Sequence, residues 1–206
     1  RCRRHQEHLS FQLGQRLAMA AELHQRVTQG NGTVPRVSDL KPARFYAAWL
    51  AHHQPVVLEG FAQGWPALKW TPEGLAEQLG QIKLEVLKGR QNVAHPDRDF
   101  RQITHQVTPQ EWVELLRQPG ESNDHYLVAR NHLMQGPAGT ILLQDTPIDA
   151  QWVDRACLQT CCSLWMGPKG TFTALHHDTC HALFVQLVGR KRFRLASPLI
   201  PDLLDS

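Results

Sequence analysis

The feature that most constrains the fold is a series of four apolar, strand-like segments in the last third of the chain. They cover residues 161–166, 171–178, 182–188 and 191–196, and short glycine-containing turns separate three of them. Short runs of apolar, β-branched and aromatic residues, bounded by Gly and Pro, are typical of antiparallel strands joined by tight turns. The sequence therefore predicts an antiparallel β core in this part of the chain.

The preceding residues predict helices placed around that core. Helix start and stop signals, such as the Thr-Pro-Gln-Glu capping box that begins at Thr108, bound four amphipathic stretches. We expect helices near residues 10–29, 42–54, 71–80 and 108–119, and additional strands near residues 56–58, 83–88 and 125–130. The predicted fold is mainly β with N-terminal helices, divided into a helical element, residues 1–53, and a β domain, residues 54–206.

Composition excludes several classes of protein. With 42% hydrophobic and 20% charged residues, a chain of 206 residues can bury a core and is not globally disordered. Its apolar runs are far shorter than the roughly 20 residues of a membrane-spanning helix, and a net charge of +3 is too weak to indicate nucleic-acid binding. Five cysteines, an odd number, fit a reducing compartment. We expect a cytoplasmic location, or a nuclear one in a eukaryote.

A histidine and an aspartate in the second strand-like segment are candidate metal ligands. Side chains alternate along a strand, so His176 and Asp178 are expected to share a face. Two histidines and one carboxylate on one face bind Fe(II) in non-haem oxygenases and leave positions open for other ligands. This spacing supplies two of those three ligands.

Lys191 is the unusual residue of the last strand-like segment. It shares a face with the apolar Phe193 and Leu195, while Arg190, Arg192 and Arg194 form the opposite, solvated face. Lysine is almost never fully buried without a partner. Two interpretations are open: Lys191 pairs with an anionic ligand inside a barrel, or its ammonium reaches water from the start of the strand.

Two stretches carry a resemblance to a known family. Residues 170–178 (GTFTALHHD) and 184–198 (FVQLVGRKRFRLASP) resemble the JmjC/cupin-like Fe(II)- and 2-oxoglutarate-dependent oxygenases. Within this family the chain resembles the branch of the asparaginyl hydroxylase that inhibits hypoxia-inducible factor, together with its bacterial relatives. Residues 55–58 and 65–70 also resemble the N-terminal half of that domain, so the likeness covers residues 55–198.

The resemblance implies a fold, cofactors and site residues. The fold would be a double-stranded β-helix, or jelly-roll. His176 and Asp178 would bind Fe(II), and Lys191 would bind the distal carboxylate of 2-oxoglutarate with support from the hydroxyls of Tyr126 and Thr173. Strict alternation places Thr173 opposite His176, so a bend or bulge is expected between them.

The implied reaction is hydroxylation of a C–H bond with O2 as the other co-substrate. A protein or peptide side chain is the favoured substrate, with demethylation as an open variant of the same step. We expect no membrane or nucleic-acid partner. A homodimer is a further expectation, because the helix at residues 10–29 has a narrow apolar stripe that must dock against the barrel or a second copy.

Two departures from the family keep an alternative open. Ala182 stands where this branch often has asparagine, and no histidine follows His181 to serve as the third metal ligand. We expect the later barrel strands and that ligand to lie beyond Ser206, in a longer chain. The alternative is a catalytically inactive cupin-like binding or interaction module.

Cysteines and tryptophans near the motif are expected in the core. Cys157, Cys161, Cys162 and Cys180 could join His181 in a zinc site, but they lack the spaced pairs of common zinc sites, so buried, structural thiols are the favoured interpretation. Trp165, inside a strand-like segment, is likewise expected to pack in the core rather than to stack on a ligand.

Overall fold

The computed structural model describes residues 11, 13–18, 21, 33–176, 178 and 180–196. The chain divides into two compact units, one made of residues 1–61 with 192–206 and the other of residues 62–191. Among the described residues, no helix is both long and apolar enough to cross a membrane.

The first unit contains a two-stranded parallel sheet and a short helix. Strand β1 pairs with β2 in a register that places Val37 opposite Leu58, and an exposed ion pair joins Arg36 to Glu59 at 2.6 Å. Residues 11, 13–18 and 21 are helical, as predicted, while the other residues of the stretch 10–29 lie outside the described part. The elements are β1 (Arg36–Ser38), α2 (Pro42–Ala48), η1 (Leu50–His52) and β2 (Val57–Glu59).

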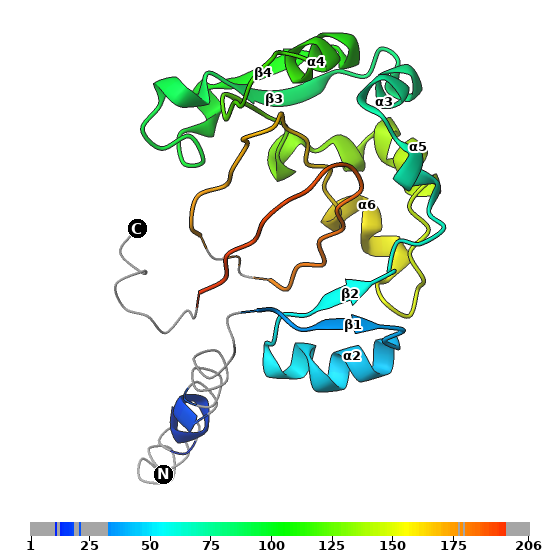
Figure 1. The fold of residues 1–206 in the computed structure, drawn as a ribbon, viewed down its shortest axis with the longest axis vertical. Coiled ribbons are helices and arrows are strands. Elements are labelled where there is room, and N and C mark those ends of the chain that lie inside the picture. The colour runs from blue at the N-terminus through cyan, green and yellow to red at the C-terminus, as the bar shows by residue number, and fades with distance from the viewer. Residues whose placement is uncertain are drawn as a thin grey trace, which may run out of the picture. The chain divides into compact units, whose positions relative to one another are not determined.

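The second unit combines a three-stranded antiparallel sheet with helices (Figure 1). The strand order is β4-β3-β5, so β3 is central. The elements are η2 (Pro66–Lys69), α3 (Pro72–Leu79), β3 (Leu84–Lys88), η3 (Arg90–Asn92), η4 (Phe100–Gln102), β4 (Thr104–Val107), α4 (Pro109–Leu116), β5 (His125–Tyr126), η5 (Ala129–Asn131), η6 (Leu133–Gln135), α5 (Pro137–Gln144), η7 (Arg155–Cys157) and α6 (Leu158–Cys161).

Helices α3 and α4 begin where the local sequence predicts. Thr71 caps α3 by accepting a hydrogen bond from the Gly74 amide at 3.0 Å. In α4, the Thr108 hydroxyl accepts from the Glu111 amide at 3.1 Å, and the Glu111 carboxylate accepts from the Thr108 amide at 2.6 Å. These side chains satisfy amides that a helix start leaves without partners.

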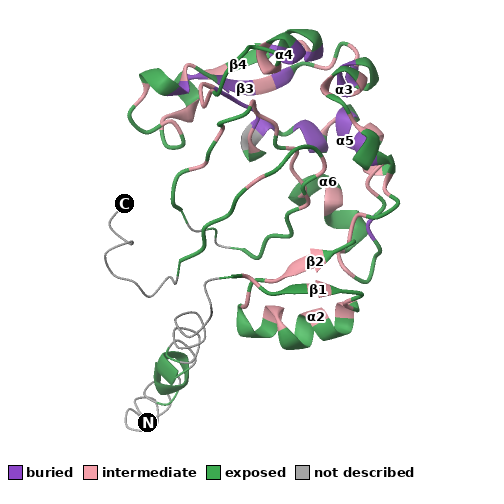
Figure 2. Ribbon diagram, in the orientation of Figure 1, coloured by how far each residue is buried: buried purple, intermediate pink, exposed green. Residues whose placement is uncertain are grey.

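The core of the second unit lies between the sheet and its helices. Leu84 and Val86 of β3 are buried with Trp112 of α4, and Figure 2 shows the buried stretches on β3, α3, α4 and α5. The other face of β3 carries Glu85 and Leu87; Leu87 is paired directly with Tyr126 of β5. Directly opposed residues point to the same face of a sheet, so Tyr126 shares this second face.

The prediction of a mainly β core in the last third is wrong for the described residues. Residues 171–176, 178 and 180–196 contain no strand, and they run as extended coil in Figure 1. A strand requires a neighbour for its ladder hydrogen bonds, and the described part of the chain provides none beside these segments. Their apolar side chains are accordingly exposed, including Phe172, Leu175, Leu183, Phe184, Val188, Phe193 and Leu195.

Two other predicted strands are shorter than expected. Of residues 161–166, Cys161 ends helix α6, and only Met166 pairs, in an isolated bridge with Leu127. The strand predicted at residues 125–130 stops at Tyr126, because η5 begins at Ala129. The described residues therefore form small sheets and no closed barrel.

The capping box of α4 provides a test of this fold. Thr108→Ala removes the hydroxyl that accepts from the Glu111 amide and should lower the free energy of unfolding by about 1 kcal/mol in urea denaturation. Thr108→Ser keeps the hydroxyl and should stay close to wild type. Equal stability of the two variants would contradict the role of the cap.

The same cap should depend on pH. Hydrogen bonds from the Thr108 backbone and hydroxyl hold the pKa of Glu111 below its ordinary value. A carboxyl with a lowered folded-state pKa contributes stability above its unfolded pKa and loses that contribution as the pH falls through the folded value. The difference between Thr108→Ala and Thr108→Ser should therefore shrink in acid.

Candidate functional site

His176 and Asp178 lie together, as their spacing predicts. His176 Nε2 is 3.9 Å from Asp178 Oδ2, and both side chains are more than half exposed. The chain bends at Leu175, which is the bend expected between Thr173 and His176. With this bend, the Thr173 hydroxyl contacts Tyr126, while the His176 imidazole, three residues later, faces Asp178.

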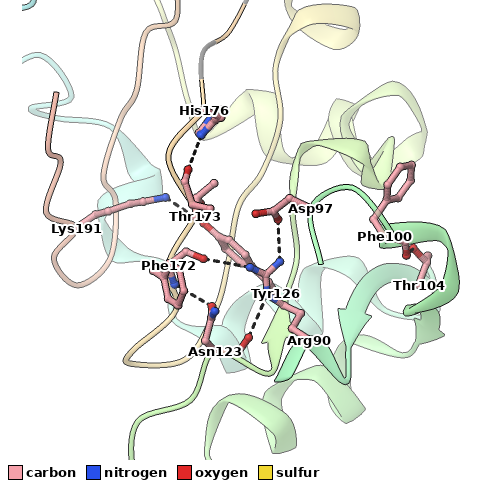
Figure 3. Close-up of polar contacts among 11 residues, drawn as sticks. Arg90, Asp97, Phe100, Thr104, Asn123, Tyr126, Phe172, Thr173, His176 and Lys191 are labelled. Atoms are coloured by element: carbon pink, nitrogen blue, oxygen red, sulfur yellow. Dashed lines mark hydrogen bonds and ion pairs between the residues drawn. The ribbon is translucent and has the colours of Figure 1, made fainter. Parts of the chain in front are cut away.

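A backbone hydrogen bond fixes which nitrogen of His176 is available. Nδ1 lies 2.8 Å from the Ala174 carbonyl oxygen, which only accepts, so Nδ1 carries the proton (Figure 3). In the neutral ring the lone pair is then on Nε2, which faces the Asp178 carboxylate. Two acceptors that face each other are stabilised by a cation between them.

The geometry of this pair fits two ligands of one divalent metal. Two ligand atoms at about 2.1 Å from an octahedral ion, at a right angle, are about 3 Å apart, and the observed separation of 3.9 Å needs only a small approach. One imidazole nitrogen and one carboxylate oxygen are two of the three protein donors of a non-haem Fe(II) site. No group of three or more His, Cys, Asp or Glu side chains that could hold a metal exists among the described residues.

The other three predicted site residues also meet, as a hydroxyl and ammonium cluster (Figure 3). Lys191 Nζ donates to Tyr126 Oη at 3.0 Å, and Tyr126 Oη is 3.3 Å from Thr173 Oγ1. Tyr126 is buried, while Thr173 and Lys191 are half-buried. The ammonium of Lys191 is thus directed at the cluster, and Arg190, Arg192 and Arg194 are exposed, as predicted.

This cluster is suited to an anion. An ammonium and two hydroxyls can all donate to a carboxylate, and hydrogen bonds to a charged acceptor are the stronger kind. A second cation, the guanidinium of Arg90, lies with its Cζ 5.3 Å from the centre of the Tyr126 ring. The surroundings of Tyr126 are therefore electropositive.

Aromatic rings surround the Lys191 ammonium. Its Nζ is 5.4 Å from the ring centres of both Trp165 and Phe184, and 5.7 Å from that of Tyr126. Trp165 also makes an edge-to-face contact with Tyr126. The prediction that Trp165 packs in the core is wrong: it is 37% exposed and forms a wall beside Lys191. Sequence reasoning assigned no role to Phe184.

The position of Thr173 depends on a clamp between two loops, residues 122–124 and 169–172. The Ser122 amide donates to the Lys169 carbonyl at 2.7 Å, and the Phe172 amide donates to Asn123 Oδ1 at 2.9 Å. Gly170 has a φ of +94°, and a Cβ there would lie 2.9 Å from the Glu121 side chain. Glycine is therefore required for this close approach.

The cysteines differ from their expected burial. Cys157, Cys161 and Cys180 are exposed, so the interpretation as buried thiols is wrong for them. Cys161 lies at the end of α6, where the helix replaces the predicted strand. Cys162 is half-buried and packs against the core; burial, and to a lesser degree Cys161, raise the pKa of its thiol.

A separate pocket of about 590 Å³ opens on the second face of the sheet. Leu87, which lines it, is paired with Tyr126, so the pocket and the Tyr126 ring share that face. None of the predicted metal or co-substrate residues lines it. Its walls are Glu85, Leu87, Phe100, Arg101, Thr104, Gln106, Val128, Asn131 and His132.

The chain is similar over most of its length to one protein family and to several known proteins. Residues 42–205 match the profile of a family described as "Cupin-like domain". Lysine-specific demethylase 8 of Danio rerio is 27% identical over 175 residues, which are 80% of this chain and 40% of that protein. The demethylase 8 of Xenopus tropicalis is 24% identical over 83% of this chain and 38% of its own length.

A third relative carries a name of the same kind. Jumonji C domain-containing protein 5 of Drosophila melanogaster is 26% identical over 192 residues, covering 86% of this chain and 44% of that protein. The chain thus spans about two fifths of the length of the curated relatives it matches.

Metal binding tests the histidine and aspartate pair. Asp178→Ala should weaken Fe(II) binding by at least about tenfold in anaerobic titration calorimetry, because even groups that only support a metal ligand contribute that much. His105→Ala, an exposed histidine on β4, should leave binding unchanged. Wild-type affinity in Asp178→Ala would show that the metal is held elsewhere.

Proposed function

The chain belongs to the cupin-like domain family, with relatives named as JmjC-domain proteins, and on that premise we propose that it is an Fe(II)- and 2-oxoglutarate-dependent oxygenase. Membership implies a jelly-roll fold. The proposed reaction is hydroxylation of a C–H bond in a protein or peptide side chain. The observation that carries the proposal is the convergence of Lys191, Tyr126 and Thr173, with Thr173 three residues before His176 in the chain.

In this proposal the Lys191 cluster binds the distal carboxylate of 2-oxoglutarate. The ammonium supplies the charge. The Tyr126 hydroxyl, 3.0 Å from Lys191 Nζ, and the Thr173 hydroxyl, 3.3 Å from Tyr126 Oη, supply directed donors. The rings of Trp165 and Phe184 flank the ammonium and limit its hydration. A carboxylate held there is oriented by several groups at once, which favours a single pose.

His176 and Asp178 would hold the iron. Bound there, Fe(II) supplies the redox chemistry that couples oxidative decarboxylation of 2-oxoglutarate to hydroxylation by O2. The Ala174 carbonyl keeps the proton on Nδ1 and so keeps Nε2 free to coordinate. Asp178 provides the negative charge that favours a divalent ion.

The names of the relatives point to a related reaction. Two of them are lysine-specific demethylases, and hydroxylation of an N-methyl group is the first step of such a demethylation. For this chain we propose that the substrate is a protein or peptide. The proposal covers two reactions on it, hydroxylation that leaves a stable hydroxyl group and demethylation. A cytoplasmic or nuclear location is part of it.

A catalytically inactive cupin-like binding module is the second candidate. Two observations favour it: Ala182 supplies no polar group where this branch of the family often has asparagine, and the described residues contain two of the three expected metal ligands. The candidates differ in one measurable product. An oxygenase forms succinate from 2-oxoglutarate in the presence of iron and O2, and a binding module does not.

Lys191 provides the kinetic test. Lys191→Ala should raise the KM for 2-oxoglutarate by roughly 10- to 150-fold, the equivalent of about 1.5–3 kcal/mol for a charge-assisted hydrogen bond, and leave Fe(II) affinity unchanged. Lys169→Ala removes an exposed lysine paired with Glu121 and should have no effect. An unchanged KM in Lys191→Ala, measured by succinate formation, would contradict the proposed role.

The proposed homodimer has its own test. Leu13 and Leu17 are one helical turn apart and more than half exposed, so a second copy could bury them together. The double change Leu13→Glu and Leu17→Glu should halve the mass per particle in light scattering. Gln15→Glu adds charge at an exposed position of the same helix and should not. A wild-type monomer would contradict the dimer.

A further inference from the structure

Arg90 is a buried cation that sequence reasoning did not single out. It begins η3, directly after the left-handed Gly89 that ends the β3 segment, and only 3% of its surface is exposed. A buried charge is costly unless hydrogen bonds and charges satisfy it. The hydrogen-bond partners of Arg90 therefore show which segments its buried guanidinium holds together.

The guanidinium joins three separate segments of the second unit. Its Nε donates to the Asn123 carbonyl at 3.0 Å, Nη1 to Asp97 Oδ1 at 3.1 Å, and Nη2 to the Phe172 carbonyl at 3.2 Å (Figure 3). Asn123 belongs to one loop of the clamp, and Phe172 belongs to the other. Arg90 thus holds both loops of the clamp from a third position.

The guanidinium also lies against the ring of Tyr126. Its Cζ is 5.3 Å from the ring centre, within the range of a cation–π contact. Phe172 directly precedes Thr173 in the chain. Arg90 therefore contacts the Tyr126 ring, which carries one hydroxyl of the cluster. It also contacts the Phe172 carbonyl, which belongs to the peptide group that joins Phe172 to Thr173, the residue with the other hydroxyl.

We propose that Arg90 is a positioning residue of the 2-oxoglutarate site, and that it holds the Tyr126 hydroxyl in reach of the Lys191 ammonium and the Thr173 hydroxyl in reach of Tyr126. This inference rests on the proposed function. The planar fork of arginine can donate in three directions while its face rests on an aromatic ring. Lysine has a similar charge but a different geometry, so it cannot replace this set of contacts.

A residue with a merely structural role would behave differently from a positioning residue. Loss of a structural contact lowers the melting temperature and the amount of folded enzyme, but the folded molecules keep their KM. Loss of a positioning contact raises the KM for 2-oxoglutarate in molecules that are folded and still bind Fe(II). The split between KM, kcat and metal affinity therefore separates the two roles.

The experiment compares two changes at Arg90 with a matched control. Arg90→Met keeps an unbranched apolar side chain but removes the guanidinium, and Arg90→Lys keeps the charge. Arg117→Met makes the same change at an exposed arginine paired with Glu73. We expect both Arg90 variants to raise the KM for 2-oxoglutarate by about tenfold, as the loss of one or two hydrogen bonds would, with Fe(II) affinity unchanged. Arg117→Met should resemble wild type.

Hydrogen exchange gives a readout that does not depend on turnover. The Phe172 amide is protected by Asn123, and the clamp that contains this bond is held by Arg90. Amides of residues 170–174 should exchange at least about tenfold faster in both Arg90 variants, because each loses a hydrogen bond that holds this loop. Asp97→Asn, which removes the charge of a partly exposed partner of Arg90 and is expected to fold, should have a smaller effect in the same direction.

The outcomes separate this inference from the proposed function. Wild-type protein that forms no succinate while Arg90→Met accelerates exchange at residues 170–174 would overturn the oxygenase and show that Arg90 still orders this loop. Unchanged exchange in both Arg90 variants would overturn the positioning role. So would a wild-type KM in Arg90→Lys, because the fork geometry would then be dispensable. If Arg90→Met does not fold, Arg90→Lys and Asp97→Asn decide the question.

Discussion

The clamp between residues 122–124 and 169–172 is the constraint on which the site depends. The Ser122 amide, the Asn123 side chain and the close approach at Gly170 fix the loop that leads into Thr173 and then His176. Within the described residues, no ladder hydrogen bonds order the segments that follow. Thr173 and Lys191 are therefore ordered by side-chain contacts with Tyr126 of β5 rather than by strand pairing of their own.

Those features that depend on nearby residues could be predicted from the sequence. The starts of α3 and α4 follow from Thr71 and Thr108, whose caps act within three residues. The proximity of His176 and Asp178 follows from alternation in an extended chain, and the bend before His176 from the need to bring Thr173 to the same site. The family resemblance, confirmed by the match over residues 42–205, supplied Tyr126 and Lys191.

Features that depend on distant partners could not be predicted. The apolar pattern of residues 182–188 is that of a strand, but pairing needs a neighbour that local pattern does not reveal. Arg90 follows a strand as an ordinary charged residue, and only the tertiary fold brings Asn123, Asp97 and Phe172 to its guanidinium. Trp165 was assigned to the core because its apolar character was visible and its neighbours Lys191 and Tyr126 were not.

The placement of Trp165 has an optical consequence. Its indole is partly exposed, lies 5.4 Å from a charged ammonium and touches the ring of a tyrosine that hydrogen-bonds to that ammonium. Indole emission responds to nearby charge and to water, so an anion that neutralises Lys191 changes both the colour and the intensity of the light that Trp165 emits. Trp112 is buried in the core, away from water. The fluorescence of Trp165 would therefore report on any anion that binds beside Lys191.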